Sequence, residues 1–209
     1  MPRPSNTRER RLQIARGLIQ IMADKGYDGA SMTEVAHAAG LTTGLIHYHF
    51  KNKREILLAA MQELAVEHDG NIAERLAQCL GDPVQEIAAF IDAHVGLGAH
   101  ANPRALACWL VVGTEALKDA QVRETYAQVM DHFNRRLTRI IEAGIRRGTF
   151  TSTSPRAAAS ALMATIQGYY LVAATARHLI PDGTAAVCTK QMAEGLLKPT
   201  QSFVDGATP

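Results

Sequence analysis

Apolar residues recur at intervals of three and four positions along most of the 209-residue chain, a period typical of amphipathic α-helices. Runs in which Val, Ile or Tyr alternate with polar residues, the usual sign of β-strands, are missing. The pattern therefore predicts an all-α fold of about nine helices. They are expected near residues 7–25, 32–39, 43–50, 53–68, 83–96, 120–147, 154–180 and 184–197, with another opening at Asn102-Pro103.

The N-terminal helices have clear start and stop signals. A side-chain acceptor three residues before a glutamate is typical of a capping box, in which each side chain binds a free amide of the first turn. Gly26 and Gly40 follow helical stretches and suit the left-handed position after a helix end. The predicted capping pairs are Asn6 with Glu9, Ser31 with Glu34, and Asn52 with Glu55.

Segments 32–39 and 43–50 have the proportions of a helix-turn-helix, because only Gly40-Leu41-Thr42 separates them. In the second helix Ile46 and Phe50 lie one turn apart, so that face is expected in the core. The opposite face is expected to carry Thr43, Gly44, His47 and Tyr48, with His49 on the flank.

The histidines of this helix allow three interpretations. His47 and His49 diverge by roughly 200° around a helix, so they cannot bind one metal ion together. A catalytic histidine needs a neighbouring nucleophile or carboxylate, and the segment offers only Glu34, which the cap uses. Plain surface residues remain an alternative. The neighbouring Lys51 and Lys53, with an arginine-rich N-terminus, favour a DNA-reading surface.

Composition and charge agree with this reading. Residues 1–60 contain nine Lys/Arg and five Asp/Glu, whereas residues 61–209 contain 13 and 15, which hints at a polyanion partner for the N-terminal part. No run approaches the ~18 apolar residues of a membrane span, and the basic start lacks the apolar region of a signal peptide. We expect a cytoplasmic protein, associated with the nucleoid through DNA. Its odd set of widely spaced cysteines suits packing roles: Cys79, Cys108 and Cys188.

The stretch "ADKGYDGASMTEVAHAAGLTTGLIHYHFKNKREIL", residues 23–57, resembles the DNA-binding signature of the tetracycline-repressor (TetR) family of bacterial regulators. The resemblance implies an all-helical homodimer with a three-helix DNA-binding head and a helical ligand-binding and dimerisation body. The matching motifs are the Lys25-Gly26-Tyr27 turn, Thr33-Glu34-x-Ala36, Ala39-Gly40 and Phe50-Lys51-x-Lys53.

The resemblance also implies which residues face a double-stranded operator. Lys53, at the start of the fourth helix, is expected to contact a phosphate with help from the helix N-terminus. His47 stands where the family most often has tyrosine, so its contact, to a base or to a phosphate, stays open. The expected DNA-binding residues are Thr33, Thr42, Thr43, Gly44, His47, Tyr48, His49 and Lys53.

The expected domains are a helix-turn-helix domain over residues 1–52, an effector-binding and dimerisation domain over 53–199, and a disordered tail over 200–209. Two apolar faces on one helix require two partners. Helices 154–180 and 184–197 are therefore expected to form a four-helix bundle with their twofold mates, the arrangement that the family implies; packing within one chain is the alternative. One such face is the small-residue stripe of Ala157, Ala161, Ala164 and Gly168, and the other is Leu162, Ile166, Tyr169 and Ala173.

The body segment "ACWLVVGTEAL…VRETYAQVMDHFNRRLTRII", within residues 107–141, also resembles, more distantly, the choline-sensing betaine-pathway repressors within the family. An aromatic cage for a quaternary ammonium needs two or more ring faces. Glu115 lies on the helix of Trp109 and could balance the charge of a cationic effector. We expect a small apolar or amphipathic effector, with a cationic one as the sharper hypothesis and core packing of the rings as the alternative. The expected pocket residues are Phe90, Trp109, Val112, Glu115, Tyr169 and Tyr170.

Two other classes of protein are alternatives. An enzyme would need a nucleophile, a base and an orienting group together, and no segment combines them. A helical protein-interaction or small-molecule-binding module could carry a helix-turn-helix for structural reasons only. The interpretation is a ligand-responsive regulator, expected to be a repressor, that is not an enzyme and uses no cofactor, metal or membrane.

Overall fold

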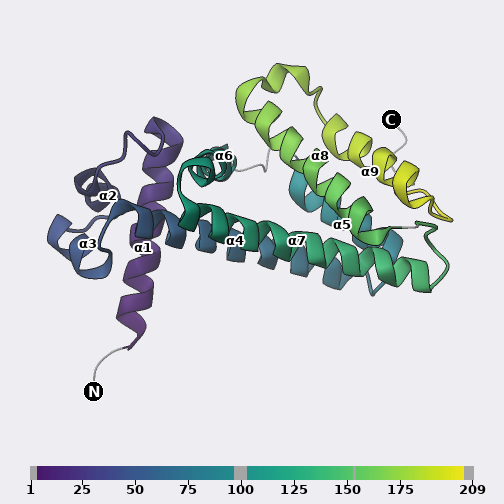
Figure 1. Ribbon diagram of the computed structural model, residues 1–209, viewed down its shortest axis with the longest axis horizontal. Helices are drawn as coiled ribbons and strands as arrows, with labels where there is room; N and C mark the ends of the chain where they lie inside the picture. Colours follow the sequence, from purple (N-terminus) through teal and green to yellow (C-terminus); the bar gives the residue numbers. More distant parts are fainter. Residues whose placement is uncertain (1–3, 97–102, 153, 205–209) are drawn as a thin grey trace. The chain divides into compact units, whose positions relative to one another are not determined.

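Two compact units make up the computed structural model (Figure 1). The model describes residues 4–96, 103–152 and 154–204. The first unit contains residues 4–67 and 103–129 of this set, and the second contains residues 68–96 and 130–204. The predicted boundary near residue 52 divides the chain by function and stays a prediction.

The described residues contain nine α-helices and one short 3₁₀ helix, and they contain no strand. The all-α prediction is confirmed. The helices are α1 Pro4–Lys25, α2 Met32–Ala38, α3 Thr43–His49, α4 Lys53–Gln78, α5 Pro83–Val95, α6 Pro103–Lys118, α7 Ala120–Arg146, α8 Pro155–Thr175, η1 Arg177–Leu179 and α9 Thr184–Leu197. By these bounds α4 and α7 each contribute residues to both units.

The core of the first unit forms where α1 packs against α2, α3 and α6. Ile14 and Leu18 of α1 and Ile46 of α3 are fully buried there, together with Val112 of α6. Ile14 and Val112, which are 98 positions apart in sequence, thus share one core. Helix α6 belongs to this unit because its apolar face covers α1.

The second unit is built around α5, α8 and α9, which pack against one another. Phe90 of α5, Ile166 of α8 and Leu197 of α9 are fully buried. The later halves of α4 and α7 add Ile72 and Leu137 to the buried residues of this unit.

Helix α4 is longer than predicted. An end near Asp69-Gly70 was expected, and the helix instead continues to Gln78. A glycine inside a helix costs only about 1 kcal/mol relative to alanine. Burying a side chain such as Ile72, which is 0% exposed, returns roughly 1.5–3 kcal/mol, so packing outweighs the weak point at Gly70. Helix α1 likewise begins at Pro4, so Asn6 lies inside it rather than at its cap.

The first part of the C-terminal tail, which was expected to be disordered over residues 200–209, is packed at Phe203. The Phe203 ring is 6% exposed and lies 5.8 Å from the Phe150 ring. The Glu194 carboxylate accepts a hydrogen bond of 2.7 Å from the Phe203 amide. The Phe203 ring and the Glu194 carboxylate of α9 thus hold this segment in place. Residues 205–209 lie outside the described residues.

Helix α8 is the most apolar of the long described helices. By length and composition alone it could cross a membrane, a test that the core helix of a protein outside a membrane also passes. Within this single chain 33% of its apolar stretch is buried. A large part of α8 therefore faces away from its own chain.

Candidate DNA-binding interface

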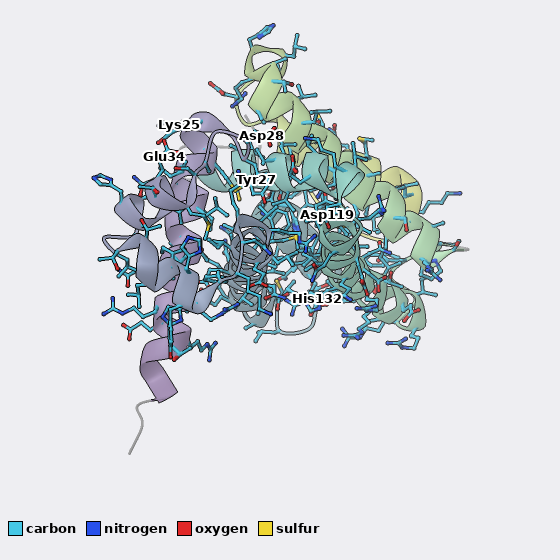
Figure 2. All side chains as sticks on the ribbon, turned by 60° about the vertical axis from the view of Figure 1, so that its left-hand side comes forward. Lys25, Tyr27, Asp28, Glu34, Asp119 and His132 are labelled. Carbon is cyan, nitrogen blue, oxygen red and sulfur yellow. The ribbon has the colours of Figure 1, made fainter. Side chains whose placement is uncertain are left out.

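The first helix of the helix-turn-helix, α2, begins in a complete capping box. The Glu34 amide donates to the Ser31 hydroxyl over 3.2 Å, and the Ser31 amide donates to the Glu34 carboxylate over 2.9 Å. The Lys25 ammonium forms an ion pair with the same carboxylate at 2.6 Å (Figure 2). The bond from Lys25, and then those from Ser31, lower the pKa of Glu34 to about 2. The predicted cap is confirmed.

The turn between the helices depends on Gly40. Its φ of +65° lies in the left-handed region, which a side chain rarely adopts, although a Cβ there would meet no atom within 4 Å. Backbone conformation rather than space therefore requires glycine, as predicted. Thr42 then caps α3, because its hydroxyl accepts a hydrogen bond of 3.3 Å from the Leu45 amide.

The two faces of α3 are arranged as the sequence predicted. Ile46 is 0% exposed and Phe50 is 1% exposed, so this face belongs to the core. Tyr48 is 80% exposed, and Gly44 and His47 are exposed as well. Thr43 and His49 are half-buried at the edges. Helix α3 thus presents small and polar groups outward on a rigid apolar base.

Helix α1 fixes the ends of both motif helices. The Arg11 guanidinium donates to the backbone carbonyl of His49 and lies 3.9 Å from the centre of the Phe50 ring. The Gln13 amide donates over 2.6 Å to the carbonyl of Ala39, at the end of α2. These contacts were not predicted, since Arg11 was read only as part of a basic arm. The sequence signal for such a role is weak: Arg11 lies one turn before the apolar Ile14.

The pKa of the His49 imidazole is affected by partial burial and by two neighbouring guanidiniums. Burial first, then the positive charges of Arg11 and Arg10, lower the pKa of its imidazole. The imidazole ring lies 5.0 Å from the Tyr48 ring, edge to face. His49 is therefore held on the flank of α3, where it was expected.

Lys53, the first residue of α4, has a partner within its own unit. Its ammonium donates over 2.7 Å to the backbone carbonyl of Tyr27 and lies 4.3 Å from the centre of the Tyr27 ring. Burial first, then the negative charges of Glu115 and Asp119, raise the pKa of Tyr27 to about 12. The side chain of Lys53 is half-buried. The expected phosphate contact stays a prediction, and the structure adds a role in holding the turn after α1.

The start of α4 is also tied to the start of α7. Arg54 forms an ion pair of 3.1 Å with Asp119, whose other carboxylate oxygen accepts bonds of 2.8 and 3.1 Å from the amides of Gln121 and Val122. Asp119 thus caps α7 and binds α4 at once. Thr33, the remaining predicted DNA-binding residue, is exposed on α2.

The expected pocket residues are divided between the two units, and their joint role stays a prediction. In the first unit Val112 is part of the core, and Trp109 lies 6.4 Å from the ring of Tyr126. Glu115 accepts a bond of 2.9 Å from Lys118. Phe90, Tyr169 and Tyr170 belong to the second unit, where Phe90 is fully buried.

The second unit contains an aromatic group that sequence reasoning missed. His68 and His94, with ring centres 4.5 Å apart, lie beside Phe90 and Phe133. No local pattern in the sequence links His94 to His68, because 26 residues separate them. No group of three or more potential metal ligands occurs among the described residues.

Comparison with known families matches both parts of the chain. Residues 14–60 match the model of bacterial regulatory proteins of the tetR family. Residues 83–197, more than half of the chain, match the model of the C-terminal region of BetI-type transcriptional repressors.

Individual relatives are distant. The chain is 25% identical over 147 residues to the HTH-type transcriptional regulator BetI of Vibrio campbellii, covering 68% of this chain and 73% of the relative. It is 24% identical over 144 residues to the fatty acid metabolism regulator protein of Bacillus subtilis, covering 68% and 71%. The fold matches a transcriptional regulator from Saccharomonospora viridis in complex with choline, with a TM-score of 0.81 at 20% identity, covering 91% of this chain and 98% of that one.

Proposed function

As the chain belongs to the TetR family of bacterial regulatory proteins and carries a BetI-type repressor body, we propose that it binds a palindromic operator as a homodimer and is released by a small-molecule effector. Regulators of this family act on DNA and are not enzymes, so the protein works where the chromosome lies, in the cytoplasm.

The outward face of α3 carries this proposal. Its residues rest on the buried Ile46 and Phe50, and the exposed Gly44 leaves room for close approach to DNA. A helix of this size fits the major groove, where hydroxyl and imidazole groups can bind base edges. We assign base-edge contacts to Thr43 and His47. The remaining assigned DNA contacts are Thr33, Thr42, Gly44, Tyr48, His49 and Lys53.

The cationic side chains around the motif suit phosphate binding. Lys51 is exposed and Lys53 is half-buried at the first turn of α4, next to the exposed end of α3. Contacts with phosphate displace counterions, so they make binding dependent on salt without reading sequence. Arg11 acts differently, since it holds α3 in position through His49.

The outward face of α8 and α9 suits dimerisation. Ala161, Ala164 and Gly168 are exposed in the single chain, and so are Leu171 at 53% and Met192 at 50%. A contiguous apolar surface with small residues lets two helices approach closely, and monomeric proteins rarely leave such a surface in water. We assign this face to the four-helix bundle between two protomers.

Effector control requires a ligand that binds the state unable to bind DNA more tightly than the DNA-binding state. A tenfold loss of operator affinity corresponds to about 1.4 kcal/mol of coupling. Helices α4 and α7 suit this coupling, because each begins at the Arg54–Asp119 pair in the first unit and continues into the second. Choline, which is bound in the Saccharomonospora viridis regulator, is the first effector to test.

Footprinting on the DNA upstream of the protein's own gene tests the operator. We expect protection of two half-sites related by a twofold axis, about one helical turn apart or a multiple of it. Absence of protection at low salt, or one protected patch without symmetry, contradicts the proposal.

Calorimetry with and without saturating operator tests the effector. Linkage requires the operator to weaken effector binding by the factor by which the effector weakens operator binding. Equal effector affinities in the two titrations mean that the ligand is not an inducer.

A further inference from the structure

Four aromatic rings meet in the core of the second unit: His68 of α4, Phe90 and His94 of α5, and Phe133 of α7. We refer to them as the histidine cluster. The centre of the His94 ring lies 4.5 Å from that of His68, 4.3 Å from that of Phe90 and 5.6 Å from that of Phe133. Buried polar rings require hydrogen-bond partners. The question for the two imidazoles in this apolar core is therefore which groups bind their nitrogens.

The tautomer of His94 follows from one contact. Its Nδ1 lies 2.8 Å from the backbone carbonyl of Phe90, and a carbonyl can only accept, so Nδ1 carries a proton. Burial, and then the neighbouring His68, lower the pKa of His94 to about 3, so the ring is neutral. A neutral imidazole has one N–H, and Nε2 therefore bears a lone pair. His94 is 6% exposed, and its Nε2 has no partner among the described residues.

His68 presents a second nitrogen of the same kind. Its Nε2 is buried and has no partner in the described part of the chain. Burial lowers its pKa to about 4, so this ring is neutral too. No described bond fixes the proton on either nitrogen, so Nε2 can donate. A hydroxyl group can donate to the His94 lone pair and accept from His68 at the same time.

The charges near the cluster are already engaged. The Asp69 carboxylate accepts bonds of 2.8 Å from His132 and 3.2 Å from Arg136. Two further side-chain atoms of α7, Arg136 Nη1 and Asn134 Oδ1, are buried without a partner in the described residues. Buried polar atoms without a partner are thus concentrated in this unit. The four rings of the cluster offer apolar faces to a ligand, and none of them carries a charge that would pair with a charged ligand.

We propose that the histidine cluster binds the effector, and that His94 Nε2 and His68 Nε2 recognise a hydroxyl group on it. The effector is then a small alcohol whose remaining atoms pack on Phe90 and Phe133. The inference rests on the proposed effector control and adds its unit, its residues and the chemical group that is read. Two of the three helices that carry the cluster, α4 and α7, are the helices joined by the Arg54–Asp119 pair.

Three matched probes separate the hydroxyl from charge and shape: choline, its uncharged carbon isostere 3,3-dimethylbutan-1-ol, and ethyltrimethylammonium, which lacks the hydroxyl. The full chain, labelled with ¹⁵N-histidine, is titrated with each by NMR and calorimetry. We expect both alcohols to bind and to move the His94 Nε2 resonance, and the affinity of ethyltrimethylammonium to be at least tenfold lower than that of choline. Equal binding of the two cations overturns the proposal, as does an Nε2 resonance that neither alcohol moves, the result expected if only a water binds there.

Matched variants test the residues. His94→Phe and His68→Phe keep a ring in the cluster and remove Nε2, and His178→Phe changes an exposed histidine of the same unit. Both cluster variants should lose at least tenfold in affinity for the alcohols, whereas His178→Phe should lose none. Tight zinc binding that moves both Nε2 resonances would instead identify a metal site and overturn the proposal. The NMR titration uses the wild-type chain, so the test stands even if a variant fails to fold.

Operator binding without a probe distinguishes the two proposals. All variants should bind operator DNA like the wild type. If none of the proteins, wild type included, binds an operator, the proposed function fails. If operator binding is intact and an effector releases DNA equally from wild type and His94→Phe, only the histidine cluster proposal fails.

Discussion

The Lys53 ammonium donates over 2.7 Å to the backbone carbonyl of Tyr27, and it also lies over the aromatic ring of Tyr27. This contact joins the first residue of α4 to the turn that follows α1. Lys53, to which we assign a phosphate contact, thus also has a partner inside the protein. Measurements can separate its role in DNA binding from its role in holding the turn.

Lys53→Ala should weaken binding to operator and to unrelated DNA by the same factor. Loss of one phosphate contact should also lower the magnitude of the salt slope by about one. Fluorescence anisotropy at several salt concentrations measures both quantities, with Arg146→Ala, an exposed cation of the second unit, as a control for removing a surface charge. A lower melting temperature with an unchanged salt slope would mean that Lys53 only anchors the turn.

Thr43→Ala and His47→Ala should change which base pairs are preferred. A good pair of hydrogen bonds to a base edge is worth about 1–3 kcal/mol of discrimination. Selection from a randomised operator library, compared between wild type and each variant, should show relaxed preference at one or two positions per half-site. A uniform loss across all positions would reassign that residue to phosphate binding.

Much of the DNA-binding motif could be predicted because its signals are local. The Ser31–Glu34 cap and the left-handed Gly40 each depend on residues within a few positions. The buried and exposed faces of α3 follow from the one-turn spacing of Ile46 and Phe50. The third expected cap, at Asn52, forms in part: the Asn52 side chain accepts from the Glu55 amide, whereas the Glu55 carboxylate binds the Lys51 amide.

The contacts that the sequence did not reveal join distant residues. Arg11 reaches His49 across 38 positions, and His68 meets His94 across 26. Neither pair has a periodic or motif signature, because each depends on how whole helices pack. Helical periodicity shows that a ring is buried without showing its neighbours, so the expected pocket stays a prediction.

Two glycines test the continuity of α4 and the packing of α7. Gly70 lies inside α4 with open space around its Cβ position, so Gly70→Ala should stabilise the fold by about 0.5–1 kcal/mol. A Cβ on Gly144 would lie 2.1 Å from the Phe150 ring, so Gly144→Ala should destabilise it, by roughly 1–3 kcal/mol. Urea unfolding gives both values. Destabilisation by Gly70→Ala would indicate that α4 ends there, as the sequence had suggested.

Ala164→Glu should convert the dimer to monomer. The side chain is exposed in the single chain, so the charge should leave the monomer folded while placing two carboxylates in the proposed bundle. Ala174→Glu, also exposed on α8 but off the stripe, is the matched control. Light scattering after size-exclusion chromatography reports mass. A monomeric wild type, or a dimer that Ala164→Glu leaves intact, would contradict this interface.

Acid should destabilise the second unit through the histidine cluster. Burial lowers the pKa of His94 to about 3 and that of His68 to about 4, from 6.5 for an unfolded chain. Below pH 6.5 the unfolded chain therefore binds protons that the folded chain excludes, and the free energy of unfolding falls as pH falls. The slope corresponds to one extra proton per histidine, on the order of 1 kcal/mol per pH unit each.

Between pH 6.5 and 4.5 Glu34, whose unfolded pKa is 4.5, contributes little; His49, whose pKa is also lowered, adds to the slope, and Glu86, whose pKa is raised by burial, opposes it. Urea unfolding across the window should show the slope in the wild type and a slope lower by about 1 kcal/mol per pH unit in His94→Phe. The exposed-site variant His178→Phe should match the wild type. A flat profile in the wild type would mean that both imidazoles are protonated in the folded protein, which would remove the His94 lone pair and with it the acceptor that the histidine cluster offers to an alcohol.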